Sequence, residues 1–339
     1  MAEPLSFQGI VDMASAYYSS AVLFAAIDAD VFGAVERLGA GATAQAVADA
    51  AGTSRRGTAM LLDACAALGL LAKDGAGAYS NTPAGRQALV PGGPADLTRA
   101  IRYNRDVYPA WGRLGEFVKT GRPAEKPSMH LGGDPERTKA FAQAMYSRAM
   151  GIGRGVVPML GLPQGCRRVL DLAGGPGAYA VLMARSYPQI EKIVTVDLPA
   201  ISGQAAEMVA AEGLQDRIEC RAGDWHGCAF GEGFDAVAIF GALHQESPEA
   251  IRGILAKAAA ALVPGGRIFV LDMMTDETRT APAFSALFGL NMALTMPCGW
   301  VFSDAELKGW LAEAGFECGE TRKAPPPMPH WMVAGTKKA

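Results

Sequence analysis

The sequence predicts an α/β protein with a mostly parallel, seven-stranded sheet in its C-terminal half and a smaller, mostly helical domain before it. From about residue 169 onward, apolar strand-like runs alternate with helical segments, which is typical of βαβ units. The first third instead contains short helices followed by a hairpin-like pair of strands. The 339 residues, half of them hydrophobic, are enough for two folded domains with a large core.

The N-terminal domain is predicted over residues 1–100. The segment AVLFAAIDADVFGAVERL repeats apolar residues at helical spacing. A helix, a turn at Gly52-Thr53-Ser54 and a longer helix to about Leu71 follow. The strand-like runs LLAKDG and AYSNT, joined by Gly75-Ala76-Gly77, predict a hairpin. A helix-turn-helix followed by a hairpin is the winged-helix pattern.

Residues 101–160 are predicted to form a helical linker and helices of a substrate pocket, interrupted by TGRPAEKPSMHLGGDPE. The main α/β domain is predicted over residues 161–339. Its strands are expected in RRVLDLA, KIVTVDL, RIECRAG, FDAVAIF and GRIFVLDM, with a terminal pair in FECGETRKA and HWMVAGTKK. The helices between them would cover both faces of the sheet.

Charge and composition disfavour several classes of partner. The net charge is −3 and no block of Lys or Arg is present, so nucleic acid is not expected. The N-terminus lacks the features of a signal peptide, and no uninterrupted apolar run is long enough to span a bilayer. Six scattered cysteines without zinc-site spacing indicate free thiols in a reducing cytoplasm and no metal site.

The stretch VLDLAGGPGAYA, residues 169–180, predicts a cofactor loop after the first strand of the sheet. Gly174, Gly175 and Gly177 do not fit the GxGxxG spacing of a dinucleotide site, and Pro176 removes a backbone N–H. Asp171 would repel a pyrophosphate, whereas it would attract an ammonium or a sulfonium. The loop therefore predicts a cationic ligand without phosphate.

Two further carboxylates follow the next strands. Asp197 ends the second strand and can accept hydrogen bonds from both hydroxyls of a ribose. In GDWHG, Asp224 could accept from an adenine amino group and Trp225 could stack on the ring. Together with Asp171 and the glycines, they predict S-adenosylmethionine as cofactor. The alternative is that these acids serve only as turn residues and helix caps.

The whole chain resembles the caffeic-acid-type small-molecule O-methyltransferases, as a bacterial member, in the motifs VLDLAGGPG, VDLP, GDW, LHQES, LVPGGRIFVLD and SDAELKGWLAEAGF. The resemblance implies an N-terminal winged-helix dimerisation domain, a homodimer and a C-terminal Rossmann-like catalytic domain. It implies an S-adenosylmethionine-dependent methyltransferase (EC 2.1.1) that releases S-adenosylhomocysteine. It also extends the expected cofactor site to Ala173, Leu198, Gly223 and Phe240.

Several positions depart from the pattern of the plant members. Ala173 replaces the first motif glycine, and Phe240 falls where a lysine touches the cofactor. His244-Gln245-Glu246 stands in place of His-Asp-Trp. The acid that supports the catalytic histidine falls near Val301 and is absent here.

His244 is the candidate general base. It follows the fourth strand, at the cofactor end of the sheet, and a histidine has an ordinary pKa of about 6.5, so it can take a proton from an acceptor hydroxyl. Glu246 is the candidate carboxylate for orienting its ring, with Asp272 and Asp276 as other possibilities.

The acceptor pocket is expected under the helices AFAQAMYSRAMGIG and ALFGLNMALTMPCGW. Apolar residues there fit either a pocket lining or ordinary core, including Met150, Phe288 and Trp300. An arginine such as Arg148 would suit an acidic substrate. The predicted substrate-binding residues are Met145, Tyr146, Arg148, Asn291, Met292 and Met296.

The sequence is compatible with three other functions. The lost acid is compatible with an S- or C-methyltransferase acting on a small acid such as a thioether hydroxy acid. A homologue that binds cofactor without methylating is a second possibility. A winged-helix DNA-binding regulator is the third, although TSRRGTAMLLDACAALG has two arginines and is then apolar, which suits a buried helix better than a recognition helix.

Overall fold

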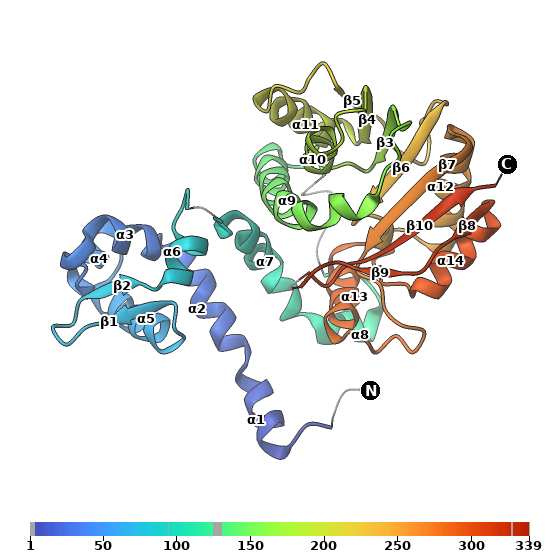
Figure 1. Cartoon of the computed structure of the whole chain (residues 1–339). Helices are drawn as coiled ribbons and strands as arrows, with labels where there is room; N and C mark the ends of the chain where they lie inside the picture. The colour runs from blue at the N-terminus through green and yellow to red at the C-terminus, as the bar shows by residue number, and fades with distance from the viewer. Residues whose placement is uncertain (1–3, 94, 125–130, 327, 339) are drawn as a thin grey trace. The chain divides into compact units, whose positions relative to one another are not determined.

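The computed structural model describes residues 4–93, 95–124, 131–326 and 328–338. The chain forms two compact units, residues 2–106 and residues 107–339 (Figure 1). Helix α7 (Thr98–Trp111) contains the boundary between them. The predicted linker segment, residues 101–160, therefore belongs mostly to the second unit. His130 lies outside the described residues.

The N-terminal unit contains the predicted helix-turn-helix and hairpin. Strands β1 and β2 pair antiparallel, with Leu71 opposite Asn81. The second helix of the motif ends at Ala67, earlier than the predicted Leu71, because Gly69 adopts a φ of +73° and the strand begins soon after it. The elements are α1 (Phe7–Ser15), α2 (Tyr17–Asp28), α3 (Val31–Leu38), η1 (Gly39–Gly41), α4 (Ala44–Ala51), α5 (Arg55–Ala67), β1 (Leu71–Lys73), β2 (Tyr79–Asn81) and α6 (Pro83–Leu89).

The first two helices carry apolar side chains that this unit does not cover. No residue of α1 is buried, and the Phe7 side chain is 85% exposed. The segment Phe7–Asp28 is long and apolar enough to cross a membrane, although Gln8 and Asp12 interrupt its apolar run. The exposed large apolar residues of this surface are Phe7, Ile10, Val11, Met13, Tyr17 and Tyr18.

The second unit is built on a mixed, eight-stranded sheet. Its strand order is β5-β4-β3-β6-β7-β10-β8, and β9 also pairs with β10. The predicted mostly parallel sheet is confirmed, and the two-residue strand β9 adds one strand to the predicted seven. The strands are β3 (Arg168–Leu172), β4 (Lys192–Asp197), β5 (Ile218–Ala222), β6 (Phe234–Phe240), β7 (Leu262–Asp272), β8 (Phe316–Cys318), β9 (Arg322–Lys323) and β10 (Trp331–Lys337).

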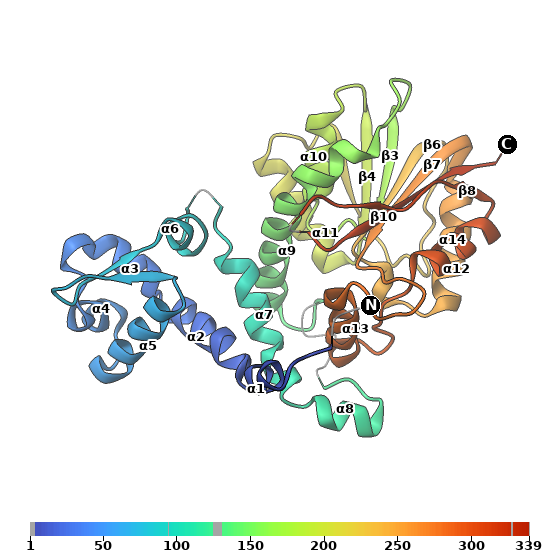
Figure 2. The same cartoon turned by 60° about the horizontal axis from the view of Figure 1, so that its bottom comes forward.

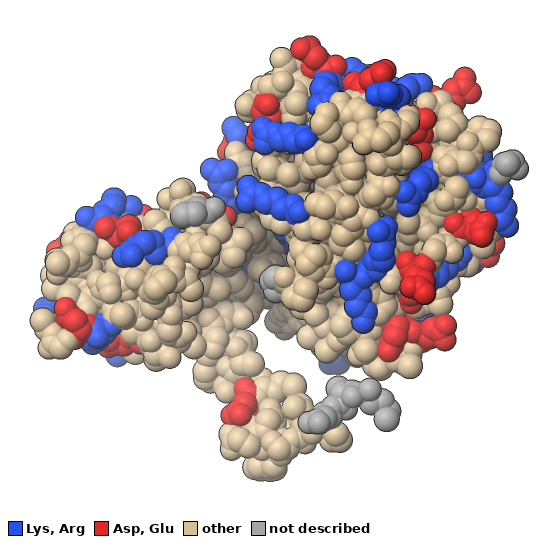
Figure 3. All heavy atoms as spheres, in the orientation of Figure 1, with Lys and Arg blue, Asp and Glu red and all other residues tan. Residues whose placement is uncertain are grey.

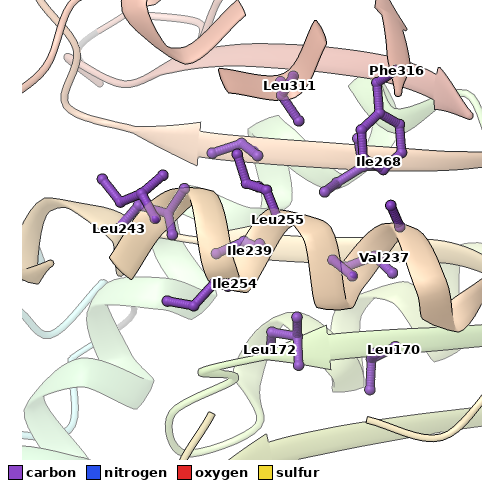
Figure 4. Close-up of a cluster of buried hydrophobic side chains, with 14 of the residues drawn as sticks. Leu170, Leu172, Val237, Ile239, Leu243, Ile254, Leu255, Ile268, Leu311 and Phe316 are labelled. Atoms are coloured by element: carbon purple, nitrogen blue, oxygen red, sulfur yellow. The ribbon is translucent and has the colours of Figure 1, made fainter. Parts of the chain in front are cut away.

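Helices bury both faces of this sheet (Figure 2). Apolar residues of β3, β6 and β7 pack under α12 and α14 on one face, where Ile254 and Leu255 cover Val237 and Ile239 (Figure 4). The other face packs against α9 and α10. The helices are α8 (Leu114–Thr120), α9 (Pro135–Val156), η3 (Val157–Leu160), α10 (Ala178–Ser186), α11 (Pro199–Ala211), η4 (Leu243–Gln245), α12 (Pro248–Ala261), α13 (Ala283–Thr295) and α14 (Asp304–Glu313).

One edge of the sheet collects the functional segments. Strands β3 to β7 run parallel, so their carboxyl ends meet at this edge. Strand β10 runs antiparallel to β7 and pairs Trp331 with Asp272, the last residue of β7. The beginning of β10 therefore lies at the same edge as the ends of the parallel strands.

Candidate active site

The loop after β3 is built for close approach of its backbone to buried acids. A Cβ on Gly174 would lie 2.0 Å from Thr195 Oγ1 and 2.6 Å from Asp171 Oδ2, so only glycine fits there. Gly175 and Gly177 have φ values of +56° and +81°, a left-handed conformation that glycine adopts without steric cost. Helix α10 begins directly after Gly177. The predicted glycine loop therefore places a helix N-terminus beside the end of β3.

Ala173, the departure from the glycine pattern, also adopts a left-handed conformation, with φ +50°. This conformation costs a residue with a Cβ about 1–2 kcal/mol. Alanine thus keeps the backbone path that the motif glycine provides, at a cost in local strain.

Asp171 is a buried acid without a hydrogen-bond donor. Asp171 is only 1% exposed, and neither of its carboxylate oxygens has a hydrogen-bond partner among the described residues. Thr195, opposite it on β4, has an unpartnered hydroxyl as well. Burial, and secondarily the charge of Asp197, raise the pKa of Asp171 to about 8. A cationic ligand in the loop would offset this burial cost, so the residues present fit the ammonium of an amino-acid-bearing cofactor.

The Asp171→Asn variant is expected to be more stable than the wild type without cofactor, by several kcal/mol at about pH 8. In the folded protein the carboxyl keeps its proton up to about pH 8, whereas the unfolded chain loses it near about pH 4. Ionisation between these values favours unfolding, so the advantage of Asn should grow as pH rises through this window. Thermal unfolding at about pH 5 and about pH 8 measures it, and an equal difference at both pH values would contradict the prediction.

Asp197 connects the end of β4 to the glycine loop. Its Oδ2 accepts a hydrogen bond from the Gly175 backbone N–H at 2.8 Å, and its Oδ1 accepts from the Leu198 N–H at 2.7 Å. Burial raises the pKa of this carboxyl, and the two backbone hydrogen bonds act in the opposite direction. The carboxylate is therefore held in a fixed orientation at the strand end, as a ribose-binding acid requires.

The turn after β5 holds the expected adenine-binding residues. Asp224 Oδ1 accepts from the His226 N–H at 2.9 Å, and the Gly223 N–H donates to the Asp197 carbonyl at 2.9 Å. The Trp225 indole donates to Glu246 Oε1 at 3.1 Å. The structure therefore joins Gly223 to the end of β4 and directs the Trp225 indole toward Glu246. Phe240 instead lies buried at the end of β6, with its ring edge-to-face against Tyr179 at 4.9 Å.

His244 is paired with Asp272. His244 follows β6, Asp272 ends the adjacent parallel strand β7, and His244 Nδ1 lies 2.6 Å from Asp272 Oδ1. The His244 backbone N–H also donates to Asp272 Oδ2 at 3.3 Å. His244 is 7% exposed and Asp272 is 1% exposed. A carboxylate on Nδ1 favours the tautomer with a proton there, which leaves the Nε2 lone pair to accept a proton.

The expectation that Glu246 orients the His244 ring is corrected by the structure. Glu246 Oε1 contacts Trp225 and also the His226 Nε2, at 3.1 Å. The 3₁₀ turn η4 carries His244, and Glu246, which directly follows this turn, points toward the turn after β5. Asp276 is likewise engaged elsewhere, where it accepts from the Thr278 hydroxyl at 2.8 Å.

Two aromatic residues contact His244 and the turn that holds it. Phe288 of α13 packs its ring edge-to-face against the imidazole at 5.0 Å. The Trp300 backbone N–H donates to the His244 carbonyl at 3.0 Å, and its indole donates to the Glu246 carbonyl at 2.7 Å. Phe288 and Trp300 were absent from the predicted substrate set because their helical spacing also fits ordinary core. The structure gives them direct contacts with the turn that holds His244.

The predicted substrate-binding residues differ in their placement. Asn291, on α13, accepts from the Trp111 indole at 2.9 Å, and Met292 of the same helix is buried. Met145, Arg148 and Met296 are half-buried. The expectation for the Tyr146 hydroxyl is corrected, because it donates to Glu212 at 2.8 Å, at the C-terminal end of α11. That end lies away from the strand ends that carry the site.

The fold defines a Rossmann-like protein whose sheet carries, at the carboxyl ends of its parallel strands, a glycine loop beside a buried acid and a buried pair of His244 and Asp272. Residues 112–317 match the family model of the O-methyltransferase domain, and residues 11–91 match that of the O-methyltransferase dimerisation domain. The chain therefore belongs to this family of O-methyltransferases. It is an S-adenosylmethionine-dependent enzyme of class EC 2.1.1 that methylates a hydroxyl of a small molecule.

Individual relatives agree with this assignment. A 3-hydroxy-5-methyl-1-naphthoate 3-O-methyltransferase of Streptomyces sahachiroi is 32% identical over 97% of this chain and 94% of its own length. The tetracenomycin polyketide synthesis 8-O-methyl transferase of Streptomyces glaucescens is 30% identical over 91% and 90%. The crystal structure of human N-acetylserotonin methyltransferase in complex with SAM has a TM-score of 0.88 at 26% identity, covering 100% of this chain and 99% of that one.

The dimerisation-domain match supports the predicted homodimer. It also gives a reason for the exposed apolar side chains of α1 and α2, which a second copy of the chain would cover. The matches favour O-methylation over the S- and C-methylation alternatives.

Proposed function

We propose that this enzyme methylates a ring hydroxyl of a small aromatic natural product or pigment precursor, with His244 as general base and Asp272 as its positioning carboxylate. The observation that carries this proposal is the buried 2.6 Å contact between His244 Nδ1 and Asp272 Oδ1. The aromatic edge of Phe288 beside the imidazole supports an aromatic acceptor. The names of relatives, with a naphthoate and a polyketide as acceptors, support the same class.

The cofactor would be held by residues from three successive strand ends. Asp171 would face its ammonium, Asp197 would accept from the ribose hydroxyls, and Asp224 with Trp225 would receive the adenine. Ala173, Gly174, Gly175 and Gly177 would supply close backbone approach, with Leu198, Gly223 and Phe240 beside them. When bound, S-adenosylmethionine supplies a methyl group on a sulfonium leaving group.

His244 then has one chemical task. Its Nε2 would take the proton from the acceptor hydroxyl, and the oxygen would then be free to accept the methyl group that the bound cofactor would supply. The resulting imidazolium is stabilised by Asp272, whose oxygens also accept from the Met273 and His244 backbone N–H groups. The carboxylate therefore fixes the ring orientation before reaction and offsets its charge afterwards.

The acceptor class is tested by a screen with S-adenosylmethionine that carries an isotopic label in its methyl group. Hydroxyaryl compounds are expected to receive the label on oxygen, because base-assisted attack needs a proton on the nucleophile. The matching methyl ethers, which have no such proton, are the control and should stay unlabelled. Label found by NMR on a ring carbon or on sulfur would contradict the proposed function.

The proposed cellular setting is a cytoplasmic homodimer that binds neither nucleic acid nor membrane. The net charge of −3 supports it. On the face shown in Figure 3, acidic and basic side chains are interspersed and neither sign forms a continuous stripe, unlike the basic surface of a nucleic-acid-binding protein.

A further inference from the structure

We propose that Glu246 is a positioning residue that links two turns of the active site, so that binding of the cofactor's adenine orders the turn that holds His244. The cofactor turn consists of residues 224–226, after β5, and the base turn of residues 243–246, after β6. This inference rests on the proposed function, in which the first turn receives the adenine and the second presents the general base. Glu246 acts through the backbone of the base turn and not on the His244 ring.

The Glu246 side chain holds two consecutive side chains of the cofactor turn. Its Oε1 accepts a hydrogen bond from the Trp225 indole N–H at 3.1 Å and lies 3.1 Å from His226 Nε2. The Glu246 side chain is only 18% exposed. Water therefore has little access to replace these contacts, and an indole N–H left without an acceptor there costs free energy.

The backbone of Glu246 belongs to the base turn. Its N–H donates to the Leu243 carbonyl at 3.0 Å, and its carbonyl accepts from the Trp300 indole N–H at 2.7 Å. The Trp300 backbone N–H in turn donates to the His244 carbonyl at 3.0 Å. A displacement of the Glu246 carboxylate therefore acts on the same hydrogen-bonded backbone that carries His244.

The cofactor turn is itself held as a unit. Lys257 of α12 donates to the Trp225 carbonyl at 2.5 Å and to the His226 carbonyl at 3.3 Å. Asp224 Oδ1 accepts from the His226 N–H at 2.9 Å. An adenine that binds Asp224 or Trp225 would thus order the side chains that meet Glu246. In the part of the chain that the structure describes, the hydrogen bonds that join the two turns all end on Glu246.

This link depends on a departure from the plant pattern. His244-Gln245-Glu246 stands where that pattern has His-Asp-Trp, so Glu246 takes the place of the tryptophan. An indole donates a hydrogen bond but accepts none. A tryptophan at this position therefore could not accept from the Trp225 indole, and the proposed link is a property of this chain.

The first test measures affinity for S-adenosylhomocysteine by titration calorimetry. Glu246→Ala is expected to raise Kd about 5- to 30-fold, because the cofactor turn loses its acceptor. Glu246→Gln keeps an acceptor oxygen and should recover most of the affinity. Glu249→Ala removes an exposed acid nearby and is the matched control, which should bind as the wild type does. Wild-type affinity in Glu246→Ala would overturn the proposal.

A double-mutant cycle tests whether Glu246 acts through the indole. Trp225→Phe keeps an aromatic ring and removes the N–H that Glu246 accepts. If the two residues act as one link, the double variant should bind S-adenosylhomocysteine about as weakly as the weaker single variant. Independent effects, in which the two fold-changes in Kd multiply, would contradict the link.

The second test follows hydrogen–deuterium exchange in the peptide that contains residues 243–246. S-adenosylhomocysteine should slow exchange of the base turn in the wild type and in Glu246→Gln, and this slowing should be lost in Glu246→Ala at saturating ligand. A merely structural role would change exchange equally with and without ligand. Undiminished slowing in Glu246→Ala would therefore overturn the proposal.

Two properties keep these tests independent of other failures. Glu246→Gln and Trp225→Phe remove single hydrogen-bonding groups, so they report on the link even where Glu246→Ala fails to fold. Failure of the proposed function is also distinguishable, because it would place the methyl label on carbon or sulfur in the wild type, whereas the binding and exchange measurements contain no acceptor.

Discussion

The His244→Ala variant is expected to lower turnover about 10²–10⁴-fold, the usual contribution of a general base, while affinity for S-adenosylhomocysteine changes little. Alanine removes the imidazole whose Nδ1 lies 2.6 Å from Asp272 Oδ1. Asp272→Asn should also be strongly impaired. Its amide can donate to Nδ1, which favours the tautomer with a proton on Nε2, and that tautomer cannot accept the proton of the hydroxyl.

Turnover is measured with labelled cofactor and the true acceptor, and calorimetry reports cofactor affinity. Asp276→Asn is the matched control, since this half-buried carboxylate contacts Thr278 and not the imidazole. A loss smaller than about threefold in His244→Ala, far below the effect of a general base, would favour an acceptor that has no proton to remove. A sulfur or carbon nucleophile would then be the better assignment.

The Asp197→Ala variant is expected to weaken cofactor binding by roughly 2–4 kcal/mol, which is about 30- to 1,000-fold in affinity. Two effects combine in this change. The ribose loses a carboxylate that can accept from both hydroxyls, and the glycine loop loses the acceptor for its Gly175 N–H. Asp197→Asn should fall between alanine and the wild type, because its remaining oxygen can satisfy only one of the two backbone donors.

Titration calorimetry with S-adenosylhomocysteine measures this effect. Asp216→Ala is the matched control, since Asp216 is an exposed acid in the loop before β5, at the opposite edge of the sheet. Wild-type affinity in Asp197→Ala would contradict the assignment of the ribose site.

The sequence was most informative about residues whose position depends on a single strand or loop. The placement of Asp171, Asp197 and Asp224 at one edge of the sheet could be predicted, because each lies at or near the end of a single strand and parallel strands bring their carboxyl ends together. The glycine loop could be predicted for the same reason, since Gly174 has no room for a side chain.

The partner of His244 could not be chosen from the sequence, because the choice depends on pairing between strands. Asp272 is 28 residues away, at the end of β7, whereas Glu246 is a near neighbour along the chain. After the turn η4, the Glu246 side chain points toward Trp225 and His226 and away from the His244 ring. The prediction that Tyr146 binds substrate failed for a related reason. Helical spacing shows which residues share a face of a helix, but it does not show which other element packs against that face.

The position of β10 also constrains how the enzyme is made. This strand is the last along the chain, yet it lies between β7 and β8 in the sheet. A ribosome must therefore release nearly the entire catalytic unit before β7 gains its final partner and Trp331 pairs with Asp272. Until then the nascent chain exposes the unpaired edge of β7, which is prone to aggregation. A chain that lacks β10 therefore also lacks the complete edge of the sheet at which His244 and Asp272 lie.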